Sequence, residues 1–64
     1  MQDFQQRVID EKKALDEKMN KLDAFLDAEN RMTISEEEEE RLKKQYNIMI
    51  DYSEILAERI AAFN

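Results

Sequence analysis

The chain lacks residue types on which small proteins rely for chemistry and for sharp turns. Cys, His, Gly, Pro and Trp are all absent from its 64 residues. Without Cys there is no disulfide, no zinc–thiolate site and no thiol nucleophile, and without His the usual general base is missing. The carboxylates and hydroxyls that remain form no recognisable catalytic or metal-ligand pattern. We therefore expect a protein that is not an enzyme and that uses no cofactor or metal.

Positive charge and long apolar runs are also scarce. Ten Lys and Arg stand against sixteen Asp and Glu, which gives a net charge of −6 at pH 7. An acidic chain is poorly suited to nucleic acid or to anionic membranes, and no apolar run reaches the roughly 18 residues of a membrane span. We expect a soluble, cytoplasmic protein. Because a chain this short is marginally stable alone and has no disulfide, self-association is the remaining way to stabilise it.

The apolar residues that are present recur at helical spacing in two segments. They predict helices over about 3–28 and 36–62, joined by a connection over about 29–35. Without Gly or Pro, nothing in the sequence breaks these helices. Two long helices with a short connection fold back on each other. The expected fold is therefore all-α, a single antiparallel two-helix hairpin over 1–64 that assembles into a homo-oligomeric helical bundle.

The start of the second helix carries a capping signal. Ser35 followed by Glu38 fits a capping box, and Thr33 followed by Glu36 fits the same pattern two residues earlier. The five consecutive Glu residues that follow Ser35 are interpreted as a solvated first turn, stabilised by the helix dipole, and not as a cation site.

In each predicted helix, residues spaced alternately three and four apart form a row that faces the other helix, which we call the seam. The two seams match in an antiparallel hairpin in which the numbers of facing residues sum to 67, so that Phe4 lies opposite Phe63. The first seam comprises Phe4, Val8, Glu11, Leu15, Lys18, Leu22 and Phe25. The second comprises Leu42, Gln45, Met49, Tyr52, Leu56, Arg59 and Phe63. Apolar residues on both sides of the second seam widen its apolar arc to roughly 240°, more than one partner helix can cover. The predicted oligomer interface comprises Tyr46, Ile48, Ile50, Ile55, Leu56, Ile60 and Phe63.

Four predicted seam positions are polar: Glu11, Lys18, Gln45 and Arg59. One interpretation is that these residues fix the register of the helices and the oligomer number, with Glu11 and Arg59 forming an ion pair. The other is a pocket between protomers, because cations, an amide and an aromatic ring suit an anionic, planar ligand such as a nucleotide. The candidate pocket residues are Arg7, Lys18, Gln45, Tyr52 and Arg59.

The sequence resembles small helical-hairpin accessory proteins of tailed phages. The resemblance is carried by the run 4–12 with Leu15, Lys18 and Leu22, and by Glu40, Arg41, Leu42, Gln45, Met49, Tyr52, Leu56, Arg59, Ile60 and Phe63. It implies a phage accessory protein that acts in the host cytoplasm. Several phage counter-defence proteins that sequester cyclic-nucleotide immune signals are similar in architecture, being short helical oligomers.

Three functions are compatible with these features. The first is a homo-oligomeric sponge that sequesters a nucleotide-derived host immune signal, favoured by the cations near Tyr52. The second is an inhibitor or adaptor that binds a host protein through the acidic surface or through Ile48 and Ile55. The third is a structural component of virus assembly. We take the first as the leading hypothesis.

Overall fold

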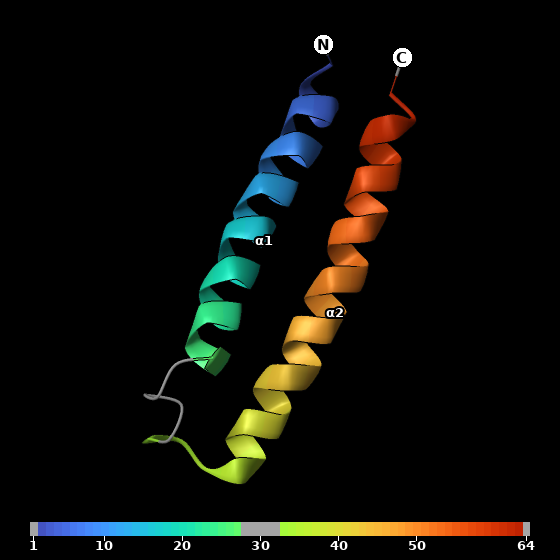
Figure 1. Cartoon of the computed structure of the whole chain (residues 1–64). Helices are drawn as coiled ribbons and strands as arrows, with labels where there is room; N and C mark the ends of the chain where they lie inside the picture. Colours follow the sequence, from blue (N-terminus) through green and yellow to red (C-terminus); the bar gives the residue numbers. More distant parts are fainter. Residues whose placement is uncertain (1, 28–32, 64) are drawn as a thin grey trace.

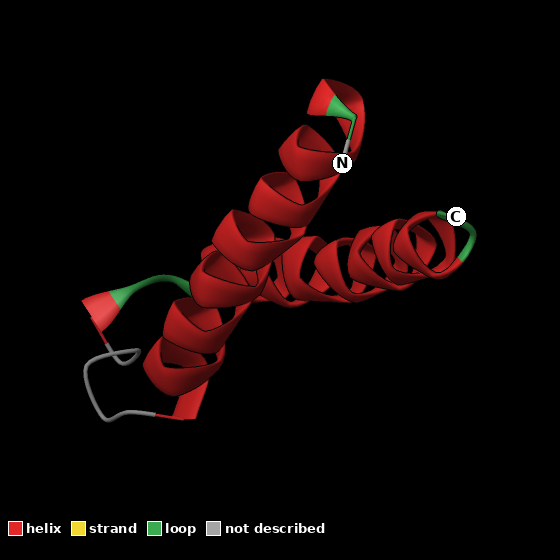
Figure 2. Ribbon diagram, turned by 90° about the horizontal axis from the view of Figure 1, so that it is seen from above, coloured by secondary structure: helices red, strands yellow, loops and turns green. Residues whose placement is uncertain are grey.

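A computed structural model of the chain describes residues 2–27 and 33–63. Two α-helices, α1 (Asp3–Asp27) and α2 (Glu36–Ala61), lie antiparallel, with the N- and C-terminal ends of the chain at the same end of the molecule (Figure 1). Seen from above, the helices cross at an angle (Figure 2). The all-α hairpin is thus confirmed. The predicted connection falls largely on residues 28–32, which lie outside the described part of the chain.

Helix α2 starts where the capping box places it. Ser35 has an extended backbone, and its Oγ accepts a hydrogen bond from the Glu38 N–H at 3.1 Å. The Glu38 carboxylate accepts from Arg41 Nε at 2.9 Å. The helix therefore begins at Glu36, the later of the two starts that the sequence allowed. The acidic side chains of this first turn face solvent or lie half-buried beside the positive end of the helix dipole.

The core of the hairpin is a narrow seam between the two helices. Val8, Leu15 and Leu56 are buried, and Met19, Met49, Ile60 and Phe63 pack against them. These residues belong to two runs of alternating three- and four-residue spacing, one on each helix. The observed seam comprises Val8, Lys12, Leu15, Met19, Leu22 and Leu26 of α1, and Leu42, Tyr46, Met49, Ser53, Leu56, Ile60 and Phe63 of α2.

Half of the predicted seam is correct and the other half is displaced by one residue. The positions that repeat every seven residues, such as Leu15 and Leu56, lie in the seam as predicted. Between them the structure uses the next residue along, so that Met19 replaces Lys18 and Ser53 replaces Tyr52. Glu11, Lys18, Gln45 and Arg59 are exposed. These four residues therefore do not form the polar layers of a dry seam.

The predicted pairing of the chain ends is confirmed. The rings of Phe4 and Phe63 meet edge to face with their centroids 5.8 Å apart. This geometry is favoured between aromatic rings because the positive edge of one meets the negative face of the other. In contrast, the expected Glu11–Arg59 ion pair is absent from the contacts of residues 2–27 and 33–63, where both side chains are exposed. Neither described helix is long and apolar enough to cross a membrane.

Candidate functional site

The five candidate pocket residues all lie at the surface of a single hairpin. Arg7, Lys18, Gln45 and Arg59 are exposed, and Tyr52 retains 42% of its accessible surface. Each of them directly precedes a seam residue in the sequence. The five pairs are Arg7 and Val8, Lys18 and Met19, Gln45 and Tyr46, Tyr52 and Ser53, and Arg59 and Ile60.

This relationship places all five residues on one side of the molecule. One residue corresponds to a rotation of about 100° about the helix axis, so each candidate lies at the same edge of the seam on its own helix. In two helices that face each other and run antiparallel, the residues that directly precede seam residues on one helix lie on the same side of the hairpin as those on the other helix. We call this surface the Tyr52 face, and it contains Arg7, Lys18, Gln45, Tyr52 and Arg59.

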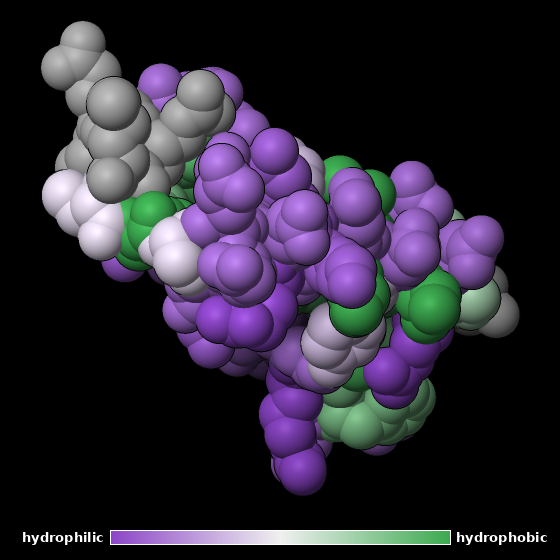
Figure 3. All heavy atoms as spheres, turned by 90° about the horizontal axis from the view of Figure 1, so that it is seen from below, coloured by the Kyte–Doolittle hydropathy of each residue, from purple (hydrophilic) through white to green (hydrophobic). Residues whose placement is uncertain are grey.

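The large hydrophobic side chains that remain exposed lie on the same face. Phe4 is 54% exposed, Ile48 68% and Ile55 53%, in addition to Tyr52. Ile48 and Ile55 directly precede the seam residues Met49 and Leu56, by the same one-residue offset. An apolar patch bordered by polar side chains is typical of an interaction or ligand-binding surface. The view from below shows mainly hydrophilic side chains, with hydrophobic side chains exposed between them (Figure 3).

The positive charges of this face contrast with the acidic chain. Arg7, Lys18 and Arg59 lie on it, in a molecule whose net charge is −6. They are nevertheless spread along the helices. Lys18 follows Arg7 by eleven positions in the sequence, which corresponds to about 16 Å at the rise of an α-helix. A single hairpin therefore presents these groups on an open surface and does not enclose a small ligand with them.

The predicted oligomer interface residues fall into three groups. Ile48 and Ile55 are exposed and available to a partner. Tyr46, Ile50, Ile60 and Phe63 are half-buried. Leu56 has no exposed surface because it packs between the two helices, so it cannot contact a second copy while the hairpin is closed. Its inclusion in the interface was wrong because the seven-residue repeat that suggested an interface belongs to the hairpin itself.

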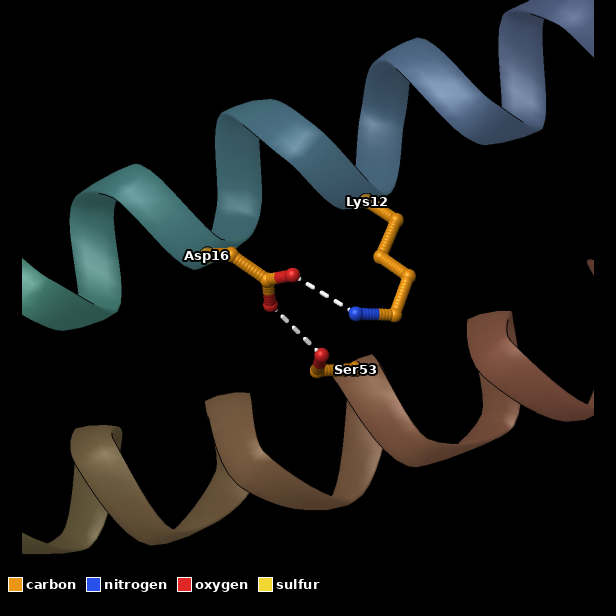
Figure 4. Close-up of polar contacts among 3 residues, drawn as sticks. All are labelled: Lys12, Asp16 and Ser53. Carbon is orange, nitrogen blue, oxygen red and sulfur yellow. Dashed lines mark hydrogen bonds and ion pairs between the residues drawn. The ribbon is translucent and has the colours of Figure 1, made fainter.

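Sequence reasoning missed the polar contacts that cross the seam (Figure 4). Ser53 is 9% exposed, and its Oγ donates to Asp16 Oδ1 at 2.6 Å. Lys12 Nζ donates to the other oxygen of the same carboxylate, Asp16 Oδ2, at 2.6 Å. A polar layer is therefore present, as one interpretation of the sequence required, but it uses other residues. We call it the Asp16 layer, and it consists of Lys12, Asp16 and Ser53.

The electrostatics of the Asp16 layer follow from these two bonds. The pKa of Asp16 lies below its ordinary value of 3.8, chiefly because the Lys12 ammonium donates to the carboxylate and secondly because the Ser53 hydroxyl does. Both donors favour the ionised form. The side chain of Asp16 is 39% exposed and that of Lys12 28%, so water screens the attraction between the two charges. Asp16 is thus ionised at neutral pH, and each of its carboxylate oxygens accepts a hydrogen bond.

An open groove of about 470 Å³ lies beside the Asp16 layer. It is lined by Ile9, Lys12, Lys13, Asp16, Glu17, Asn20 and Ile60. Ile9, Lys13 and Asn20 directly follow seam residues, so the groove is on the side of the hairpin opposite to the Tyr52 face. Its two lysines are balanced by two carboxylates, and Lys12 is already paired with Asp16. The groove is therefore less suited to an anion than the Tyr52 face is.

Within residues 2–27 and 33–63, no group of three or more acidic side chains is placed to hold a metal ion. The side chains that the structure brings together are thus of two kinds. The Tyr52 face combines exposed cations with an amide, an aromatic ring and aliphatic surface. The Asp16 layer is an internal contact whose buried hydroxyl has a partner. The Tyr52 face is open to a ligand or a macromolecule.

Comparison with known protein families gives a match over almost the whole chain. A family model described as Sequestin matches residues 2–62, which is almost the whole chain. No curated protein and no solved structure matches the chain significantly. The name of the family is consistent with a sequestering role.

Proposed function

The chain belongs to the Sequestin family, and from this premise we propose that it is a non-enzymatic phage counter-defence protein, a homo-oligomeric sponge that sequesters a nucleotide-derived host immune signal. The observation that carries the proposal is the composition of the Tyr52 face. It brings together cations, an amide and a half-exposed aromatic ring on one side of an acidic molecule.

The chemistry of that face suits a ligand with phosphates and a planar base. Arg7 and Arg59 can donate paired hydrogen bonds to phosphate oxygens, and Lys18 adds a point charge. The ring of Tyr52 offers a surface on which a base can stack, and the Gln45 amide can both donate to and accept from the edge of a base. Sequestration needs only these binding contacts, which agrees with the absence of His and Cys from the sequence.

A second copy of the chain is needed to convert the open face into a pocket. Two Tyr52 faces that meet would cover Ile48 and Ile55 and would bring cations from both copies around one cavity. This arrangement also removes the exposed apolar patch, which monomers rarely tolerate. Because the rest of the molecule is acidic, the local field of the pocket would have to attract the anion against the net charge. The same net charge disfavours nucleic acid and anionic membranes as partners.

Binding can be tested directly with a ligand panel. We expect at least one cyclic dinucleotide, cyclic trinucleotide or ADP-ribose derivative to raise the melting temperature of the purified protein. The rise should disappear in Lys18→Met and in Arg59→Ala, which remove cations from the Tyr52 face. Lys13→Met is the matched control, because Lys13 is an exposed lysine on the opposite side. Native mass spectrometry of the same samples reports the oligomer mass and the bound ligand together.

The exposed pair Ile48 and Ile55 also fits a second function, in which the chain inhibits or recruits a host protein. The two functions give opposite results in the experiment above. If no compound of the panel changes the melting temperature, the sponge is contradicted and the host-protein inhibitor becomes the better hypothesis. If a compound binds equally well to wild type and to Lys18→Met, a sponge is supported but the Tyr52 face is not its binding site.

A further inference from the structure

The Asp16 layer occupies the point in the seam where the apolar pattern favours a different packing. At the centre of α2 the seam residue is Ser53, although Tyr52 directly before it has the larger apolar surface. One residue corresponds to about 100° about the helix axis, so a rotation of α2 by about half of that angle would bring Tyr52 into the seam and Ser53 out of it while Met49 and Leu56 stay in it. Ser53 is 9% exposed and Tyr52 42% exposed, so the structure adopts the packing with the polar residue inside.

We propose that Asp16 and Ser53 are positioning residues that hold α2 in the rotation in which Tyr52 is presented to solvent. The Ser53 hydroxyl can remain in the seam because Asp16 accepts its hydrogen bond at 2.6 Å. Lys12 in turn holds the carboxylate from the other side, also at 2.6 Å. The purpose of this contact rests on the proposed function, but the contact and its effect on Tyr52 do not.

The energetic argument compares a buried hydroxyl that has its hydrogen-bond partner with one that has lost it. A buried hydroxyl that keeps its partner is tolerated, whereas one that loses its partner has left water without gaining a hydrogen bond in return. Removal of the acceptor should therefore penalise the observed rotation and favour the one that buries Tyr52. Removal of both polar groups should cost little, because an alanine at position 53 fits an apolar seam. Only a contact that sets the rotation gives this pattern.

The experiment measures the exposure of Tyr52 by acrylamide quenching of its fluorescence. All variants carry Tyr46→Phe, which leaves Tyr52 as the sole tyrosine of a chain that contains two and no Trp. We expect Asp16→Ala to lower the quenching constant about twofold or more, because the ring moves from a partly exposed position into the seam. The double variant Asp16→Ala with Ser53→Ala should return to the parent value.

Two control variants separate this effect from a general loss of structure. Asp16→Asn keeps an acceptor for Ser53 and should have the same quenching constant as the parent. Glu17→Ala removes a neighbouring exposed carboxylate, with the same change in net charge as Asp16→Ala, and should also quench like the parent. If Asp16→Ala is unfolded at 25 °C, the measurement is made in trimethylamine N-oxide, which favours the compact state.

The proposal is overturned if folded Asp16→Ala has the same quenching constant as its parent. It is also overturned if the quenching constant of the double variant stays as low as that of the single variant. No ligand is required for this measurement. A ligand panel without a hit would therefore contradict the sponge and leave the positioning role standing, whereas an unchanged quenching constant would contradict only the positioning role.

Discussion

Asp16 is the residue whose ionisation is most closely tied to the fold. Its carboxylate accepts hydrogen bonds from Lys12 and Ser53, and these bonds hold its pKa below 3.8 in the folded chain. A group with a depressed folded pKa contributes stability that is complete above the unfolded pKa and is lost as the pH falls through the folded pKa. The contribution of Asp16 is therefore complete at neutral pH, begins to be lost as the pH falls towards 3.8, and is gone only below the depressed folded pKa.

This sign can be checked against Asp16→Asn. We expect the difference in free energy of urea unfolding between wild type and variant to be constant from pH 7 to pH 5. It should then shrink as the pH falls below 3.8, because the wild-type carboxyl becomes protonated and the other carboxylates titrate in both proteins. An equal difference at pH 7 and pH 2 would show that the ionised carboxylate does not contribute.

At the scale of the helices, the N-terminus of α2 depends on one side chain. Ser35 Oγ accepts from the Glu38 N–H, which otherwise has no partner within the helix. Ser35→Ala should therefore lower the free energy of unfolding by about 1 kcal/mol, the usual effect of losing an N-cap. Ser35→Asp, which keeps a capping oxygen and adds a charge at the positive end of the dipole, should retain the stability of wild type. Urea unfolding monitored by circular dichroism distinguishes the two, and equal losses in both variants would contradict the capping role.

The helices and half of their seam could be predicted because they depend on regular features of the sequence. The absence of Gly and Pro, the Ser35 cap and the seven-residue repeat through Leu15 and Leu56 are each visible in the printed chain. The other half of the seam was displaced because both three- and four-residue steps are compatible with a helix. Hydropathy favours Tyr52 over Ser53 at that step. The hydrogen bond from Ser53 to Asp16, which joins residues far apart in the sequence, decides otherwise.

The sequence suggests the candidate residues but not their arrangement in space. The five residues share one face, because the displacement of the seam left Lys18, Gln45, Tyr52 and Arg59 directly before seam residues, where Arg7 already stood. They surround no enclosed cavity in a single copy. The groove beside Lys12 and Asn20 was not predicted, because neither residue belongs to the predicted seam or to the candidate pocket.

At the scale of the whole molecule, the exposed aliphatic surface of α2 predicts self-association. A single hairpin leaves Ile48 and Ile55 more than half exposed. We expect light scattering at micromolar concentration to give a mass of at least twice the 7.7 kDa of one chain. Ile55→Glu should dissociate or unfold the assembly, because a carboxylate without a partner is costly to bury. Glu54→Ala changes an exposed neighbour on another side of α2 and should leave the mass unchanged. A stable monomer of the wild type would contradict the prediction.

The ring contact between Phe4 and Phe63 joins residues that are nearly the full length of the chain apart. The entropy cost of closing a loop grows with its length, so contacts near the connection are expected to form first and this ring pair last. Interactions that form after the folding transition state slow unfolding and have little effect on the rate of folding. The two phenylalanines thus act on the lifetime of the closed hairpin and not on the speed with which it forms.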